Sequence, residues 1–225
     1  MDRFRLTAET SSRQANLRCM RQKIISLFAL VAFMALLGLN ARAQSKNEVG
    51  LLLGGSIVPT STTNLNIHSG LAYQATYAHR FTSRGSIGFG VEVPFVALPS
   101  QDVQSASPSS PRNYASLFVT PGFRLTFAPD ARVSPWASVG GGYARFAEST
   151  TLVTGAPNSF KAGTNKGALQ YGGGADFKTP LRILLPLAVR LEARDFYSGQ
   201  PRLNVARTSS GQHNVIVSGG LVVRF

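Results

Sequence analysis

The sequence predicts an all-β protein, an eight-stranded antiparallel up-and-down β-barrel that crosses a membrane and follows a cleaved signal peptide. Three observations predict this architecture. After residue 44, apolar and polar residues alternate with a period of two in eight segments. The connections between these segments alternate between long and short. An apolar run with an Ala-X-Ala motif precedes the first segment.

The amino-terminal part of the chain has the three parts of a secretory signal. A short basic region follows Met20, an apolar run covers residues 24–39, and Ala41-Arg42-Ala43 ends the signal. The apolar run is short for a membrane-spanning helix. We therefore expect cleavage after Ala43, a leader and signal over 1–43, and one barrel domain over 44–225. Met20 is itself an ordinary start, which would place residues 1–19, with the only cysteine, outside the translated protein.

The first four predicted strands cover residues 48–56, 71–81, 87–97 and 114–127. The third is the clearest, because its even-numbered positions hold only Glu92, proline, valine and glycines, while its odd-numbered positions are apolar throughout. The fourth alternates in the same way, with Phe118 as an exception on the polar face. Such alternation indicates one face toward lipid and one toward the barrel interior.

The last four predicted strands cover residues 136–146, 168–178, 187–196 and 212–225. The segment 136–146 is the weakest, because three consecutive glycines at 140–142 blur its alternation. Placing Arg145 inward there predicts that Trp136 and Phe146 face outward. All eight segments are long enough for a tilted crossing of roughly 9–11 residues.

The polar faces of these strands carry charges of both signs, which we expect inside the barrel. They are Glu92, Arg124, Arg145, Asp176, Lys178, Arg190, Glu192, Arg194 and Arg224. Such charges suit either an ion conduit or a plug of salt bridges. The plug is favoured, because the interior of an eight-stranded barrel is just wide enough for side chains to fill.

The connections support a membrane orientation. The long ones cover roughly 57–70, 98–113, 147–167 and 197–211, and the short ones cover 82–86, 128–135 and 179–186. Long outer loops and short periplasmic turns are typical of outer-membrane barrels. An even number of strands also puts both ends of the domain on the periplasmic side.

The closing strand ends in an aromatic residue, with Phe225, Val223 and Leu221 on its apolar face. It resembles the closing strand of bacterial outer-membrane β-barrels, and the resemblance implies that the barrel-assembly machinery reads these residues as a signal. The stretches 134–143 and 190–197 also resemble the outer membrane protein beta-barrel domain family, which includes small barrels of the OmpX, OmpA-transmembrane and opacity-protein type. The resemblance implies a Gram-negative outer-membrane location among lipid and lipopolysaccharide.

The net charge of +13 does not indicate nucleic-acid binding, because 1–43 holds seven Lys/Arg and two Asp/Glu and the other basic residues are scattered. No metal-ligand spacing or phosphate-binding loop is evident, so we expect no cofactor. Of the histidines His68, His79 and His213, the last lies close to Ser209 and Ser210. This is similar to the Ser/His/acid set of lipid A-modifying barrels, but no acidic partner is evident, and we expect no catalytic residues.

We therefore expect a non-enzymatic outer-membrane barrel with a structural or surface-interaction role, exerted through four extracellular loops. The alternatives are a narrow pore for small solutes and, less favoured, a lipid A-modifying enzyme. The loops hold basic residues that could meet anionic lipopolysaccharide or simply be solvated. These are Arg112, Lys161, Lys166, Arg202 and Arg207.

Overall fold

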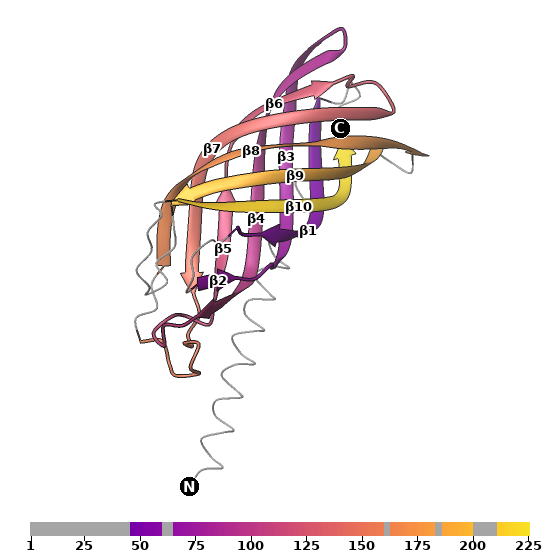
Figure 1. Cartoon of the computed structure of the whole chain (residues 1–225). Helices are drawn as coiled ribbons and strands as arrows, with labels where there is room; N and C mark the ends of the chain where they lie inside the picture. The colour runs from indigo at the N-terminus through magenta and orange to yellow at the C-terminus, as the bar shows by residue number, and fades with distance from the viewer. Residues whose placement is uncertain (1–45, 60–64, 160–162, 183–185, 200–210) are drawn as a thin grey trace. The chain divides into compact units, whose positions relative to one another are not determined.

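The computed structural model describes residues 46–59, 65–159, 163–182, 186–199 and 211–225. The predicted leader and signal peptide lie outside these residues. The described part is built of strands, and within it no helix is long and apolar enough to cross a membrane. The strands are β1 (Asn47–Ile57), β2 (Leu65–Ile67), β3 (Leu71–Arg84), β4 (Ile87–Ser105), β5 (Asn113–Val119), β6 (Gly122–Phe127), β7 (Val133–Glu148), β8 (Gly163–Arg182), β9 (Pro186–Gly199) and β10 (Gly211–Arg224) (Figure 1).

The strands form a closed antiparallel ring. β1 pairs with β3, β3 with β4, β4 with both β5 and β6, and these two with β7. β7, β8, β9 and β10 follow in order, and β10 pairs back onto β1. Reciprocal backbone hydrogen bonds of 3.0 and 2.9 Å between Asn47 and Phe225 complete this seam. Because β5 and β6 together make one crossing, the ring has the predicted eight crossings.

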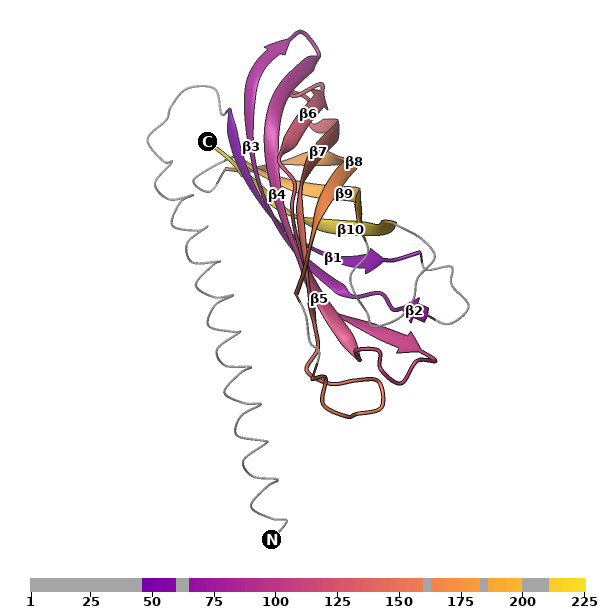
Figure 2. The same cartoon turned by 90° about the vertical axis from the view of Figure 1, so that its left-hand side faces the viewer.

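The connections alternate between the two ends of the barrel. In Figure 2 the β3–β4 turn lies at one end, and the β4–β5 and β7–β8 connections lie at the other. β1 begins and β10 ends on the side of the short turns. This is the periplasmic end of an outer-membrane barrel.

Several strand boundaries differ from the sequence prediction. The predicted strand 114–127 is divided at Thr120 and Pro121, because proline has no N–H to donate to the ladder. β4 continues to Ser105 and β8 starts at Gly163, so the loops predicted at 98–113 and 147–167 are shorter. The extra strand β2 pairs with the end of β4. These extensions lie at the extracellular end of the barrel. Their backbones continue the strand pairing, but their sequences are rich in polar residues and lack the regular apolar alternation on which the prediction rests.

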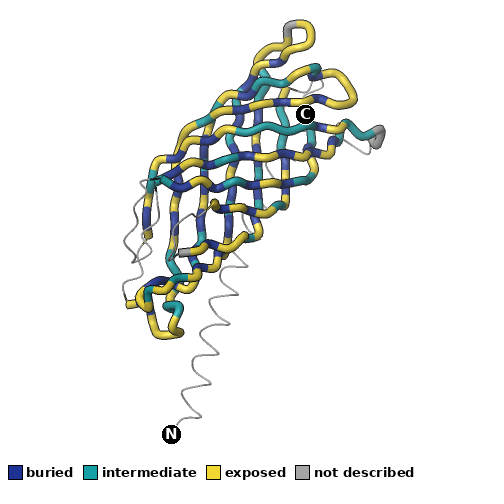
Figure 3. The backbone as a smooth tube through the Cα atoms, in the orientation of Figure 1, coloured by how far each residue is buried: buried dark blue, intermediate teal, exposed yellow. Residues whose placement is uncertain are grey.

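Burial alternates along the strands, as the tube in Figure 3 makes visible. In β4, for example, Phe89 and Phe95 are exposed while Glu92 is buried. Large apolar residues on the outer face of the barrel include Leu53, Phe123 and Val139, all more than half exposed. An apolar exterior around a polar interior is the inverse of a water-soluble protein and matches a barrel surrounded by lipid.

The predicted orientation of β7 is wrong. Trp136 and Phe146 are 3% and 1% exposed and face inward, whereas Arg145 is exposed on the outer face. β7 pairs without interruption through its three glycines, so its side chains alternate along the whole strand. Arg145 and Trp136 are an odd number of positions apart and therefore point to opposite faces of β7. The outward Arg145 lies only three residues before the extracellular end of β7, where its charge can reach the interface.

Candidate functional site

The periplasmic half of the lumen is filled by a network of eight charged side chains, here called the ionic layer. It consists of Glu48, Glu92, Arg124, Asp176, Arg190, Glu192, Arg194 and Arg224. Four carboxylates thus face four guanidinium groups, and their formal charges cancel. This balance offsets the large cost of burying each charge.

Asp176 accepts hydrogen bonds from three of the four arginines of the ionic layer. Arg190 binds it in two places, with its Nε 2.6 Å from Oδ1 and an Nη 2.8 Å from Oδ2. Arg224 and Arg124 approach Oδ2 at 2.7 and 3.2 Å. Glu48 contacts the same three arginines, at 2.6 Å for Arg190. The two carboxylates therefore hold β1, β6, β8, β9 and β10 together from inside.

A second group of contacts lies deeper in the barrel, around Arg194. Its Nε donates to Glu192 at 2.6 Å, and its terminal nitrogens bind both oxygens of Glu92. Gln74 donates to the same Glu192 oxygen at 2.6 Å. Arg124 links the two groups, because one of its nitrogens lies 3.8 Å from Glu92.

Trp136 lies at the centre of the ionic layer. The guanidinium carbons of Arg124, Arg194 and Arg190 are 4.3, 4.7 and 5.2 Å from the centroid of its ring. Cations within about 6 Å of an indole face are attracted by its quadrupole, more strongly when desolvated. The register of β7 turns Trp136 inward, and three guanidinium groups surround its ring there.

Small residues on the inner face of β8 make room for these long side chains. A Cβ added to Gly172 would lie 2.8 Å from Cγ of Arg194, and one on Gly174 would lie 2.8 Å from Cβ of Glu192. The same Cβ atoms would lie even closer to the backbone of β9, 2.6 Å from the Ala193 carbonyl oxygen and 2.3 Å from that of Leu191. These glycines are therefore required by the close approach of the β9 backbone as well as of its charged side chains.

The extracellular half of the lumen is closed by a second group, here called the aromatic layer. Its rings are Tyr114, Phe118, Phe146 and Phe196, which are all at most 1% exposed. Phe118 touches Phe196 and Phe146 with centroid distances of 5.0 and 5.8 Å, and Tyr114 lies 6.1 Å from Phe146. The apolar residues Val96, Leu98 and Ile216 complete this packing.

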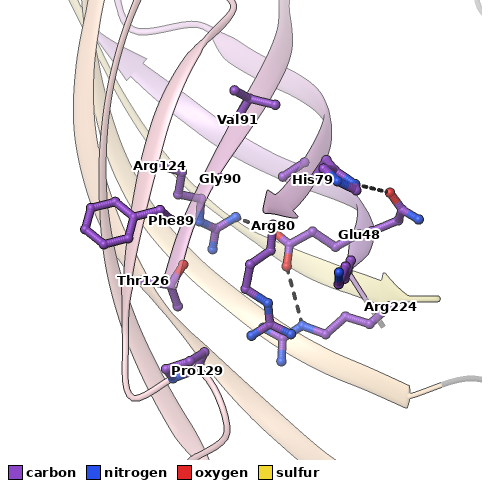
Figure 4. Close-up of a pocket in the computed structure, with 13 residues that line it drawn as sticks. Glu48, His79, Arg80, Phe89, Gly90, Val91, Arg124, Thr126, Pro129 and Arg224 are labelled. Carbon is purple, nitrogen blue, oxygen red and sulfur yellow. Dashed lines mark hydrogen bonds and ion pairs between the residues drawn. The ribbon is translucent and has the colours of Figure 1, made fainter. Parts of the chain in front are cut away.

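A small pocket opens at the periplasmic end of the ionic layer (Figure 4). Glu48, Arg124 and Arg224 meet along its wall, and His79 binds Asn47 beside it at 2.7 Å. Its volume of about 30 Å³ is enough to hold ordered water between these charged side chains.

The remaining predicted positions fall as follows. Lys178 is half-buried at the periplasmic end and donates to the Pro129 carbonyl at 2.8 Å. Phe225 and Val223 are half-buried and Leu221 is exposed at the β1–β10 seam. His68 is exposed on a loop. Ser209, Ser210, Lys161, Arg202 and Arg207 lie outside the described residues.

The sequence analysis did not include Glu48 among the interior charges, although Glu48 alternates along β1 with the inward-facing Gly50 and Leu52. It also missed an acidic partner for His213. The Nδ1 of His213 lies 2.6 Å from Oδ2 of Asp195, which accepts a second hydrogen bond, also 2.6 Å, from Tyr171. The register places these residues on the outer wall, where adjacent strands bring them together. Among the described residues, no serine or threonine hydroxyl bonds this histidine, and no cluster of His, Cys, Asp and Glu could hold a metal.

The closed ring, the apolar exterior and the charged interior define a small eight-stranded β-barrel of the bacterial outer membrane. Solved structures with a similar fold include Neisserial surface protein A (TM-score 0.49, 12% identity, 80% of this chain and 98% of that chain) and the outer membrane protein OprG from Pseudomonas aeruginosa (0.48, 11%, 80% and 96%). The outer membrane enzyme PagL is also similar (0.41, 16%, 77% and 97%). These likenesses concern the fold alone. No protein-family profile and no curated protein matches the sequence.

Proposed function

We propose that this protein is a non-enzymatic, non-conducting outer-membrane barrel that acts through its extracellular surface. The observation that carries the proposal is the filled lumen. The ionic layer occupies its periplasmic half and the aromatic layer its extracellular half, and both are almost wholly buried. A solute would have to separate several ion pairs and several packed rings in order to pass. Interaction is therefore left to the outside of the barrel.

The extracellular connections support a role in binding. The β4–β5 and β7–β8 connections are joined to each other, because Arg112 N–H donates to the Thr151 carbonyl at 2.9 Å and Val153 N–H to the Ser110 carbonyl at 3.0 Å. Pro111 and Leu152 form an isolated β-bridge between them. A surface held in this way loses little conformational entropy when a partner binds.

The proposal is tested by single-channel recording in planar bilayers. The barrel is inserted after its folding has been verified by the difference in electrophoretic migration between boiled and unboiled samples. We expect no regular conductance steps across a wide voltage range, because neither layer leaves a continuous aqueous path. Reproducible steps of uniform size would overturn the proposal and favour the narrow pore.

A further inference from the structure

Positive charge gathers at the periplasmic end of the lumen without a matching number of acids. Outside the ionic layer, the charged side chains described at this end are four basic ones and one acidic one, namely Lys46, Arg80, Arg132 and Lys178 against Asp130. The extracellular end is balanced in comparison. Its described charges are Arg112, Arg145 and Lys166 against Asp102, Glu148 and Asp195. The periplasmic end thus carries a positive surplus that the described part of the chain does not neutralise.

The strand register directs three basic side chains into the mouth of the lumen. Arg80, Lys178 and Arg224 each follow, two positions later, a buried residue of the inner face, and these residues are Ala78, Asp176 and Val222. All three basic residues lie near the periplasmic ends of their strands, β3, β8 and β10. They therefore point toward the barrel axis at its opening and away from the surrounding lipid.

These side chains gather around the small pocket at the periplasmic end. Arg80 and Arg224 both line it, and in Figure 4 their guanidinium groups extend toward each other. Lys178 donates at 2.8 Å to the carbonyl of Pro129, which is another residue of the pocket wall. Three strands thus bring three cations to one opening.

The three cations repel one another. Arg80 and Arg224 both repel the ammonium group of Lys178, and the carboxylates that attract it are Asp130 and Asp176. Asp176 is already shared by three arginines of the ionic layer, and Asp130 is exposed in the turn between β6 and β7. An anion at the opening would lower the free energy of holding these cations together.

Two side chains at the opening keep hydrogen-bond donors for a ligand. An ammonium group has three N–H donors, and among the described residues Lys178 uses one, toward Pro129. Arg224 donates through Nε to Glu48 and through Nη2 to Asp176, which leaves its Nη1 without a partner in the described part of the chain. The carboxylate of Glu48 accepts from three arginines, so its own charge is offset.

We propose that the periplasmic opening, formed by Lys46, Arg80, Lys178 and Arg224, binds one phosphate group. The phosphate lies across the opening and accepts from Lys178 and Arg224, while the pocket behind it holds water. Guanidinium and ammonium groups are the side chains that proteins use for phosphate. A phosphate suits the site better than a carboxylate, because it offers more acceptor oxygens to donors that arrive from different strands. Its source is either a soluble phosphate ester of the periplasm or the headgroup of a phospholipid in the inner leaflet, which present the same oxygens.

The test measures phosphate binding by the full barrel in a non-ionic detergent, after folding has been verified by electrophoretic migration. Inorganic phosphate is titrated by calorimetry at constant ionic strength against chloride, and acetate is titrated in the same way. The variant Lys178→Gln removes the charge but keeps a donor for the Pro129 carbonyl, and Lys178→Arg keeps the charge. The matched control is Lys166→Gln, because Lys166 is also half-buried on the inner face of β8 but lies at the extracellular end.

We expect one phosphate per barrel, bound roughly tenfold more weakly by Lys178→Gln because a charge-assisted hydrogen bond is lost. Lys178→Arg and Lys166→Gln should bind as the parent protein does. Absence of saturable phosphate binding, an unchanged affinity in Lys178→Gln, or a loss in either of the other two variants would overturn the proposal. Acetate that binds as tightly as phosphate would also overturn it.

The two sources of the phosphate are separated by a competition experiment. Short-chain phosphatidylglycerol is added to the complex of the barrel with inorganic phosphate. Displacement of the inorganic phosphate that Lys178→Gln weakens would assign the site to a lipid headgroup. Retention of the inorganic phosphate would assign the site to a soluble phosphate ester.

Discussion

Both halves of the lumen are built from inward-facing positions of the same ring of strands, yet charged pairs fill one half and mainly aromatic and aliphatic side chains fill the other. A few buried polar groups accompany the aromatic layer, such as Gln212, which donates to the hydroxyl of Tyr114. In the ionic layer, Asp176 is shared by three arginines and neutralises charges that lie far apart in the chain. In the aromatic layer, Phe118 contacts two other rings and carries no polar atom. The difference teaches that alternation sets only the direction of a side chain, while the neighbours across the lumen decide which chemistry is tolerated there.

The largest loss of stability is expected when Asp176, the carboxylate that three arginines share in the ionic layer, is removed. Asp176→Ala leaves Arg124, Arg190 and Arg224 with Glu48 as their main partner, and breaking a buried pair costs up to about 5 kcal/mol because an uncompensated charge remains. We expect the midpoint of urea unfolding, followed by the electrophoretic shift, to fall sharply. The matched control is Asp102→Ala, at an exposed position near the extracellular end of β4, which should leave the midpoint unchanged. An unchanged midpoint in Asp176→Ala would contradict the role of the shared carboxylate.

A smaller loss is expected in the aromatic layer. Phe118→Ala leaves a cavity among the rings of Phe146 and Phe196, at a cost of about 3 kcal/mol. Phe118→Leu keeps most of the volume and should cost less than about 1.5 kcal/mol. The same urea titration measures both variants. A ranking in which leucine is as harmful as alanine would show that the layer does not depend on packing volume.

The sequence predicted the barrel, its eight crossings and the faces of most strands, because a lipid exterior forces strict alternation over the whole crossing. It predicted less about the site. Glu48 and Arg224 are 176 residues apart, so nothing local indicates that they meet. The orientation predicted for β7 is wrong because it follows the charge of Arg145 as the guide to the inner face. The small polar residues Ser134 and Ser138, which share the face of Trp136, were the better signal.

The outer wall shows the same limit of sequence reasoning. The partner of His213 was missed because Asp195 belongs to another strand and reaches the histidine only through the register of β9 and β10. Asp195 lies on the outward-facing side of β9, among apolar residues that the alternation predicts to face lipid. A charged residue on an apolar face was the signal that could have revealed this cluster.

The most direct test of which side chains face the lumen and which face the lipid uses Trp136, the only tryptophan in the chain. In liposomes, its fluorescence is measured with lipids brominated along their acyl chains and, separately, with aqueous acrylamide. Because the indole is enclosed by three guanidinium groups within the lumen, we expect neither reagent to quench it appreciably until the barrel is unfolded. Arg145→Ala, on the outer face of the same strand, should leave this protection intact. Strong quenching by brominated lipid in the folded protein would place Trp136 outside and contradict the charged, filled interior.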